Sequence, residues 1–389
     1  MTAEDGRLRR LWVRNFRSLA DVEMRLGRIT VVQGANASGK TNVYRALRLL
    51  SRGAAGELAR AVLSEGGMPS MLWAGDRVGA RTPPPVRLTL GVTLGELSYE
   101  LALGLPVGPI PPTDEHELPG RLVRRLVVGG PHDRRPFVLD GEVKEERAWF
   151  GGKPTRHTTL LDRAARSATA RADDEVVSFP MTLDPGEPVL GQLGEPGRFP
   201  ELFDLRERLR RWRFYHSFPT DDGAPARAVQ TGVRTPVLAD DGRDLAAAIA
   251  TIDDMGAGPA LRDAVRHALG AELVVEVEPT RGTFALALAV QGVRRPMTAA
   301  ELSDGSLRFL CLAAALLSPR PPPLLVLNEP ETSLHAGVVE ALAALVVGAA
   351  EHSQVVLTTH DDDLAAALVE TGADLVALRR NADGRTVTS

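Results

Sequence analysis

The stretch at residues 29–42 reads ITVVQGANASGKTN, and its positions 34–41 match the pattern G-x-x-x-x-G-K-[ST] without a substitution. The β-rich run Ile29–Gln33 before the first glycine predicts a buried strand. After the motif, the spacing of Val43 and Leu47 predicts the apolar face of a helix. A glycine-bounded loop between a strand and a helix presents backbone N–H groups and a helix N-terminus to an anion. The stretch therefore predicts a phosphate-binding loop.

Lysine is rare in this chain, and one lysine lies inside the motif. Among 46 Lys and Arg residues, only Lys40, Lys144 and Lys153 are lysines. A compact ammonium on a flexible stem can reach between phosphates, so we expect Lys40 to contact the β- and γ-phosphates of a nucleotide and Thr41 to ligate magnesium. The alternative, a glycine turn that holds a lysine by chance, is disfavoured by the flanking elements. The residues predicted to bind the nucleotide in this loop are Gly34, Ala35, Asn36, Ala37, Ser38, Gly39, Lys40, Thr41 and Asn42.

Composition disfavours several classes of protein. The chain has 389 residues, 44% of them hydrophobic, and a formal net charge of −4, which argues against a globally basic nucleic-acid binder. Its single cysteine, Cys311, cannot form an internal disulfide or a cysteine zinc site. The sequence has no run approaching the ~18 apolar residues of a membrane-spanning helix, and its N-terminus lacks the apolar core of a signal peptide. We therefore expect a cytoplasmic protein with no membrane partner.

A second pattern, PLLVLNEPE at Pro323–Glu331, predicts an acidic residue at the edge of a sheet. Its apolar residues run directly into Asn328 and Glu329, as in a buried parallel strand that ends in polar residues. In such folds phosphates bind at the carboxyl ends of the strands. Glu329 would then polarise an attacking water as general base. The alternative is a helix that starts after a core strand, with Glu329 as a favourable first-turn charge.

Two further segments bring polar residues to positions where a nucleotide phosphate can bind. Leu302–Ser306 reads LSDGS and precedes a long apolar helical pattern, so its hydroxyl and glycine residues lie at a helix N-terminus. Helix capping, with Ser303 or Ser306 as the N-cap, is the simpler interpretation of this segment alone. Val355–His360 (VVLTTH) predicts a strand beside the Glu329 strand, which would let His360 reach a γ-phosphate or its attacking water.

The remaining chain predicts further elements on either side of a long middle region. Residues 86–105 alternate as antiparallel strands do, with Gly91 and Gly95 as turn or bulge positions. Proline and glycine content predicts a connection over 75–85 and an exposed loop over 106–120. Helices are predicted at 202–212, 245–251, 259–269 and 338–350, and strands at 8–15, 22–26, 273–278 and 284–290. We expect a single domain with three parts, at 1–74, 75–200 and 201–389.

Arginines gather on the helix predicted at 202–212 and directly after it. One interpretation is a solvated face with Glu–Arg pairs along the helix, and the other is a nucleic-acid contact through phosphates. We favour the first interpretation. The residues concerned are Arg206, Arg208, Arg210, Arg211 and Arg213.

Taken in order, the phosphate loop, LSDGS, the LNEPE strand followed by TSLH, and the strand-end His360 resemble the ABC-type ATPase heads of the RecF and structural-maintenance-of-chromosomes (SMC) superfamily. The chain is more closely similar to the small bacterial predicted ATPases of that group that lack a coiled-coil arm. The resemblance spans Leu8 to about Asp363, with specific motifs only at its two ends. It implies an α/β P-loop NTPase fold, an ABC-type ATPase head with a mainly parallel core sheet, an antiparallel β subdomain and a helical or irregular insert.

The resemblance also implies a role for each motif. In that superfamily two heads enclose two ATP molecules, and the signature segment of one head closes on the γ-phosphate bound by the other. Carried over, Ser303 and Gly305 would act across a homodimer that forms with ATP. Glu329 would be the general base, His360 the γ-phosphate sensor that orients water, and Lys40 the phosphate-binding catalytic residue.

For magnesium the resemblance implies Thr41, Asn328 and the glutamine of a loop, for which we choose Gln192 because it follows the antiparallel strands. Arg17, in an NFRS run that such heads place near the nucleotide, is a further candidate. Two positions depart from the family pattern. Asn328 stands where heads usually have aspartate, so it supplies an oxygen without a negative charge. Asp304 replaces the first signature glycine and would repel a γ-phosphate unless it points away.

The resemblance implies ATP binding and slow ATP hydrolysis with Mg²⁺, coupled to head-to-head dimerisation. Action on DNA, in repair, genome maintenance or defence, follows from the resemblance alone. An alternative function is a regulatory nucleotide-binding switch, with little or no turnover, that controls a separate effector protein. A transporter's cytoplasmic ATPase is a third function, which the size of the antiparallel insert disfavours.

Overall fold

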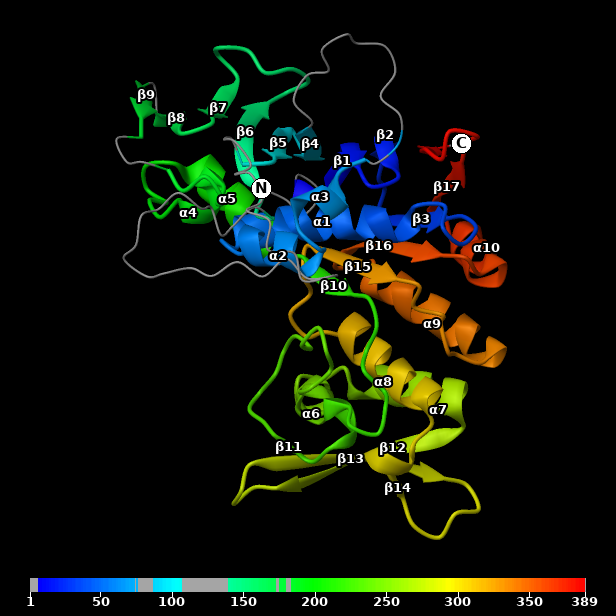
Figure 1. The fold of residues 1–389 in the computed structure, drawn as a ribbon. Coiled ribbons are helices and arrows are strands. Elements are labelled where there is room, and N and C mark those ends of the chain that lie inside the picture. The colour runs from blue at the N-terminus through cyan, green and yellow to red at the C-terminus, as the bar shows by residue number, and fades with distance from the viewer. Residues whose placement is uncertain are drawn as a thin grey trace, which may run out of the picture.

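The structure is a computed structural model that describes residues 6–73, 75, 87–106, 139–172, 175–179 and 183–388. The predicted connection over 75–85 and the predicted loop over 106–120 lie outside these residues, except for their first positions. The described chain forms three β-sheets and ten α-helices (Figure 1). Among the described residues, none of these helices is long and apolar enough to span a bilayer.

The largest sheet has eight strands, is antiparallel throughout and has the order β2-β1-β4-β5-β6-β7-β8-β9. Its strands are β1 (Leu8–Phe16), β2 (Leu19–Arg25), β4 (Arg87–Leu94), β5 (Leu97–Gly104), β6 (Glu142–Phe150), β7 (Thr159–Ala164), β8 (Ser167–Ala172) and β9 (Glu175–Ser178). The antiparallel strands predicted over 86–105 are confirmed, since β4 and β5 form a hairpin there. Gly95 lies in its turn with a φ of 61°. Gly91 instead lies within β4, where a Cβ would be 1.9 Å from the Trp12 ring.

The second sheet contains the strand that precedes the phosphate loop. Its order is β10-β15-β16-β3-β17-β18, in which the first five strands are parallel and β18 is antiparallel. Its strands are β3 (Ile29–Gln33), β10 (Arg213–Tyr215), β15 (Leu324–Asn328), β16 (Gln354–Thr359), β17 (Asp374–Arg380) and β18 (Thr386–Thr388). This is the mainly parallel core sheet that was predicted, with the strand before His360 beside the strand before Glu329.

Both faces of the parallel strands are buried, and alternate residues pack into two different hydrophobic cores. Val32, Val326 and Val356 pack into the core shared with the antiparallel sheet. Their neighbours Val31 and Leu327 point the other way, into the core built around the C-terminal helices. The alternation follows from the two-residue period of a strand. It explains why these strands read as continuous apolar runs in the sequence.

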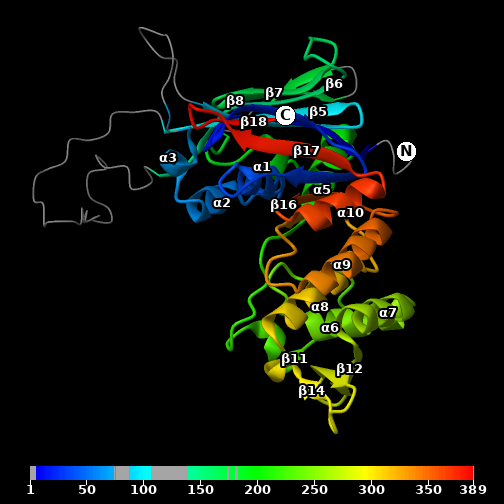
Figure 2. The same cartoon turned by 90° about the vertical axis from the view of Figure 1, so that its right-hand side faces the viewer.

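The helices divide between the two lobes seen in Figures 1 and 2. They are α1 (Lys40–Ala54), α2 (Leu58–Ser64), α3 (Met68–Met71), α4 (Val189–Gln192), α5 (Pro200–Arg210), α6 (Leu245–Asp254), α7 (Gly258–Leu269), α8 (Asp304–Leu316), α9 (Ala336–Ala349) and α10 (Asp362–Glu370). Helix α1 lies between the two large sheets, in contact with β1 on one side and with β15 and β16 on the other. This burial holds the phosphate loop, at the start of α1, against the edge of the parallel sheet.

The second lobe lies on the opposite side of the parallel sheet from the antiparallel sheet (Figure 2). It contains α6, α7, α8 and a small sheet of β11 (Gln230–Thr231), β12 (Ala271–Glu278), β13 (Thr283–Val290) and β14 (Met297–Thr298). Helix α9 packs against both α7 and α8 and joins the two lobes. Cys311 is fully buried in α8, as expected of a small apolar residue.

Candidate functional site

The phosphate loop closes around the side chain of Lys40. The Lys40 ammonium donates hydrogen bonds to the backbone carbonyls of Gly34 (2.6 Å) and Ala35 (3.1 Å), and its side chain is only 2% exposed. The loop needs two residues with positive φ, Ala37 at 65° and Gly39 at 110°. This backbone path leaves Ala35–Ala37 at the surface. The geometry is that of a concave backbone site with one lysine at its floor.

The C-terminal strand supports this loop from behind, which the sequence reasoning missed. The hydroxyl of Thr386, in β18, donates to the Ser38 carbonyl (2.8 Å) and is also within hydrogen-bond distance of the Ser18 hydroxyl (2.8 Å). The Asn42 side chain donates to the same Ser18 hydroxyl (3.0 Å), so Asn42 faces the support and not the concave side of the loop. A Cβ on Gly39 would lie 2.4 Å from the Thr386 hydroxyl oxygen. The loop is therefore fixed by residues more than 300 positions away in sequence.

Glu329 lies beside the phosphate loop, at the carboxyl end of β15. Its Oε1 is 3.7 Å from the Lys40 ammonium, and its side chain is 29% exposed. Its φ is 48°, and its backbone N–H donates to the Thr358 carbonyl on the neighbouring strand (2.9 Å). The left-handed backbone turns the chain sharply at the end of the strand. The carboxylate is consequently partly exposed at the sheet edge and not in the first turn of a helix, the alternative raised by the sequence.

Asn328 is buried at the same edge, between two neutral partners. Its Oδ1 accepts a hydrogen bond from the Thr358 hydroxyl (3.0 Å), and its Nδ2 is 2.8 Å from Nδ1 of His216. Burial lowers the pKa of His216 below its ordinary value, and the nearby Arg45 and Arg308 lower it further. The neutral imidazole is then the acceptor of the Asn328 amide proton. Asparagine, unlike aspartate, can donate to this histidine, which gives the departure from the family pattern a local structural reason.

His216 is a site residue that the sequence reasoning missed. It directly follows β10, which is parallel to β15, so both strands end at the same edge of the sheet. Its ring also packs beside Tyr44 of α1, with 5.6 Å between the ring centroids. A polar residue after the short apolar run Phe214–Tyr215 is the signal that could have identified it.

His360 lies next to two carboxylates at the end of β16. Its Nδ1 is 3.3 Å from Oε1 of Glu331 and 3.9 Å from Oε1 of Glu329. Glu331 is buried and also accepts from the Thr359 hydroxyl (2.6 Å) and from the His360 backbone N–H (3.3 Å). The structure therefore brings together Lys40, Glu329 and His360, as expected from the motifs. Glu331, which holds the start of the His360 segment, was not singled out from the sequence.

The signature segment begins helix α8. Ser303 is the N-cap and accepts from the Ser306 backbone N–H (3.2 Å), so the capping interpretation holds for its side chain. A Cβ on Gly305 would lie 2.6 Å from the Ser333 carbonyl oxygen, which requires glycine there. Asp304 pairs with Arg227 at 2.7 Å, an ion pair that compensates the charge expected to repel a phosphate. Farther along this helix, Arg308 donates to the Glu329 carbonyl (3.0 Å) and ties α8 to the strand-end turn.

Arg17 is not placed at the phosphate loop. Its guanidinium pairs with the Glu65 carboxylate (2.7 Å) and donates to the Glu65 carbonyl (3.0 Å), beyond the end of α2. Its backbone N–H is bonded to the Met71 carbonyl. The neighbouring Ser18, and not Arg17, is the residue of this run that contacts the loop's support.

The position of Gln192 disagrees with its predicted role as a magnesium ligand. Gln192 ends α4, and its amide donates to the carbonyls of Glu187 (3.2 Å) and Pro188 (3.3 Å). The preceding residue, Gly191, packs against Gly53, at the far end of α1 from the phosphate loop. At 1.5 Å per residue, the length of this helix puts about 20 Å between the two ends. Its order along the chain did not indicate which end of α1 this segment reaches.

Magnesium fits the donors at the sheet edge if phosphates complete its ligand sphere. The described residues contain no group of three or more His, Cys, Asp and Glu side chains that could hold a metal ion. The oxygen donors here are the Thr41 hydroxyl, in the first turn of α1, and Asn328 Oδ1, which has one accepting position used by Thr358. Mg²⁺ commonly takes one or two protein oxygens together with phosphate oxygens and water. The donor set is compatible with that mode of binding.

The arginines of α5 follow the solvated-face interpretation. Arg208 pairs with Asp204 (2.7 Å) and Arg210 pairs with Glu207 (2.7 Å), both within the helix. Arg206 donates to the Leu193 carbonyl. These three side chains therefore have partners in the chain, whereas the side chains of Arg211 and Arg213, which follow α5, have no hydrogen bond or ion pair with any described residue.

A protein-family model matches residues 29–366, from β3 to α10, and its family is described as an AAA domain, putative AbiEii toxin, Type IV TA system. The match covers most of the chain and includes the phosphate loop, the signature segment and both strand ends. The chain belongs to this AAA-domain family. A comparison of this AAA-domain protein with curated protein sequences gives no significant match.

Solved SMC head domains share the fold of this AAA-domain protein. One, an SMC head bound to the C-winged helix domain of ScpA, matches with a TM-score of 0.50 at 15% identity, over 98% of this chain and 97% of that one. Another, an SMC head with an extended coiled coil bound to the C-terminal domain of ScpA derived from Pyrococcus furiosus, gives a TM-score of 0.51 at 13% identity, over 98% and 96%. At such identities the likeness establishes the fold. The AAA-domain protein therefore has the fold of an SMC-type head, as its motifs predicted.

Proposed function

We propose that this AAA-domain protein binds ATP at the phosphate loop and hydrolyses it slowly, with Glu329 as general base. The observation that carries the proposal is the convergence of Lys40, Glu329 and His360 from three separate elements. The Lys40 ammonium is 3.7 Å from Glu329, and His360 is 3.9 Å from the same carboxylate oxygen. A phosphate seated in the loop would lie close to all three side chains.

Each residue has a distinct part in the proposed reaction. Lys40 would exchange its loop carbonyls, at 2.6 Å and 3.1 Å, for phosphate oxygens of ATP. That exchange would also loosen its attraction to Glu329, leaving the carboxylate free to take a proton from the attacking water. His360, fixed by Glu331, would orient the same water or contact the γ-phosphate. Magnesium bound with the nucleotide would neutralise phosphate charge, held on the protein side by Thr41 and Asn328.

We further propose that ATP joins two copies of the chain through Ser303 and Gly305. The close approach of Gly305 to Ser333 fixes the start of α8 next to the chain segment that follows Glu329. Hydrolysis would remove the γ-phosphate that both copies contact. The closed dimer would then be less stable than it is with ATP, and it would open. DNA is the client suggested by the SMC-type fold. The paired arginines of α5 do not add support for it.

The test is ATP turnover with Mg²⁺, followed together with size-exclusion chromatography, for the wild type and three variants. Lys40→Ala and Glu329→Gln should each lower turnover roughly hundredfold or more. Lys153→Ala removes an exposed lysine and is the matched control, so it should behave like the wild type. Dimers should accumulate with ATP in Glu329→Gln. Full turnover in either of the first two variants would refute the assigned roles.

A second candidate function is a nucleotide-binding switch without turnover that controls a separate effector. The observation that favours it is the neutral pair of buried Asn328 and exposed His216, which provides no carboxylate where heads usually have one. Under this function the wild type would bind ATP and form the dimer without releasing phosphate. Asn328→Asp would then raise turnover, and the same substitution would lower it if the neutral pair is needed for hydrolysis.

A further inference from the structure

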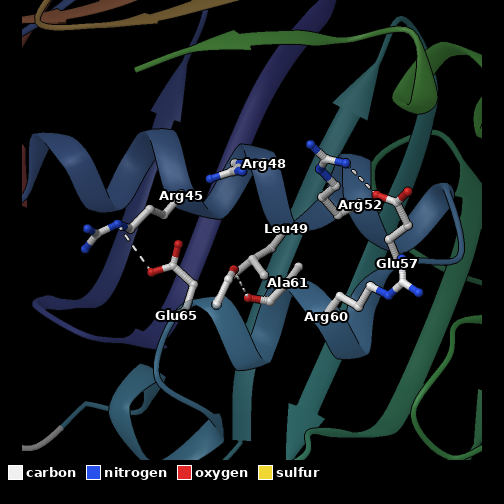
Figure 3. Close-up of a pocket in the computed structure, with 9 residues that line it drawn as sticks. Arg45, Arg48, Leu49, Arg52, Glu57, Arg60, Ala61 and Glu65 are labelled. Atoms are coloured by element: carbon white, nitrogen blue, oxygen red, sulfur yellow. Dashed lines mark hydrogen bonds and ion pairs between the residues drawn. The ribbon is translucent and has the colours of Figure 1, made fainter. Parts of the chain in front are cut away.

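Helices α1 and α2 line an open basic pocket that the nucleotide site does not use. The pocket has a volume of about 290 Å³ and is lined by four arginines, Arg45, Arg48 and Arg52 from α1 and Arg60 from α2. Figure 3 shows the α1 arginines spaced along one helix face, with Arg60 on the facing helix. Positions i, i+3 and i+7 share a face because of the helical period. Concentrating like charges in one concavity costs energy unless an anion enters it.

The acidic residues in the pocket do not balance the arginines. Glu65 pairs with Arg45 at 3.3 Å and is shared with Arg17. Glu57 pairs with Arg52, which also pairs with Asp240 at 3.2 Å, outside the pocket lining. The other two cations, Arg48 and Arg60, have no hydrogen bond or ion pair with any residue that the structure describes. The lining thus holds two guanidinium groups in excess over carboxylates.

We infer that this pocket is a second anion site, which binds a small phosphorylated molecule independently of the phosphate loop. Arginine guanidinium groups bind phosphate oxygens through paired, charge-assisted hydrogen bonds. Arg48 and Arg60 lie on different helices, and both line the pocket. Leu49 and Ala61 add apolar lining, which suits the carbon skeleton of a phosphate monoester.

The shape of the site favours a small ligand over a nucleic acid. Its arginines line a concave space between two helices, at the lower end of the volumes typical for small-molecule pockets. Nucleic-acid backbones are usually bound by extended basic stripes or grooves. On the described surface nearby, Arg208 and Arg210 of α5 pair with carboxylates of their own helix, and Arg206 donates to the Leu193 carbonyl.

The experiment measures ligand binding to the full chain with the phosphate loop silenced. Isothermal titration calorimetry of Lys40→Ala with inorganic phosphate and ribose 5-phosphate should give saturable one-to-one binding, and unphosphorylated ribose should not bind. Wild type saturated with a non-hydrolysable ATP analogue is a second background, in case Lys40→Ala folds poorly. Adding Arg48→Ala and Arg60→Ala should weaken phosphate binding roughly tenfold or more. The charge-matched control is Arg281→Ala with Arg294→Ala, two exposed arginines outside the pocket.

Two outcomes would overturn the inference. One is the absence of saturable phosphate binding in both backgrounds, or binding that Arg48→Ala and Arg60→Ala leave unchanged. The other is a duplex DNA that binds much more tightly than ribose 5-phosphate and is lost in the same double variant, which would identify a nucleic-acid surface. Neither outcome bears on ATP binding by Lys40, so a failure here is separable from a failure of the proposed function.

Discussion

The two ends of helix α1 hold cations in opposite ways. At its start, Lys40 is 2% exposed and its ammonium is bonded to backbone carbonyls inside a rigid loop. Toward its end, Arg48 and Arg52 project from the helix surface into an open pocket. At the first end, backbone carbonyls hold the ammonium of Lys40 in place. At the second end, the side chains of one helix bring several planar guanidinium groups into the same pocket. From this difference we propose that the first end is specific for a polyphosphate and that the second is a more permissive anion site.

The largest effect on ATP affinity is expected from a substitution at the first glycine of the phosphate loop. In Gly34→Ala, the added Cβ would lie 2.4 Å from the Leu378 carbonyl oxygen and 2.6 Å from the Ser38 hydroxyl oxygen. Because a backbone atom cannot yield as a flexible side chain can, the loop must shift, and ATP affinity should fall roughly tenfold or more. The control is Gly348→Ala in α9, where no atom lies within 4 Å of the added group. Equal ATP affinity in the two variants would show that the loop is not rigid.

The second largest effect concerns the support of His360. Glu331→Gln removes the negative charge that faces His360 at 3.3 Å and weakens the hydrogen bonds from Thr359 and the His360 backbone. We expect kcat to fall about tenfold while ATP affinity stays the same, since the phosphate loop is untouched. Glu351→Gln, at an exposed turn, is the matched control. A fall in affinity with unchanged kcat would contradict a positioning role.

A smaller effect is expected from the C-terminal support of the loop. Thr386→Val keeps the shape of the buried side chain but removes its hydrogen bonds to Ser18 and Ser38. The free energy of unfolding should fall by about 1–2 kcal/mol, measured by urea denaturation, with a modest loss of ATP affinity. Thr388→Val alters an exposed threonine of the same strand and should leave both quantities unchanged.

The smallest effect is a pH dependence of stability due to His216. Its folded-state pKa is lowered by burial and nearby arginines. The stabilisation is therefore complete above the unfolded value of about 6.5 and is lost as pH falls below it. His216→Asn should flatten this part of the curve of unfolding free energy against pH. If the curve of His216→Asn were as steep as that of the control His352→Asn, His216 would not be the cause of this pH dependence.

The sequence was sufficient to predict those parts of the site whose residues are contiguous in the chain. The phosphate loop, β15 and β16 each carry a complete local pattern, so the positions of Lys40, Glu329 and His360 could be predicted from it. Thr386 and His216 reach the same site from distant segments whose local sequence carries no phosphate-binding pattern. Gln192 was assigned wrongly because order along the chain does not specify which end of α1 a later segment meets.

The measurement that tests the central claim most directly is equilibrium binding of Mg²⁺-ATP to variants at the two ends of α1. Lys40→Ala should lose ATP binding, whereas the double variant Arg48→Ala and Arg60→Ala should bind ATP as the wild type does. The account would be contradicted by ATP binding that survives Lys40→Ala and is lost in the double variant. That result would place the nucleotide at the arginine pocket and not at the phosphate loop.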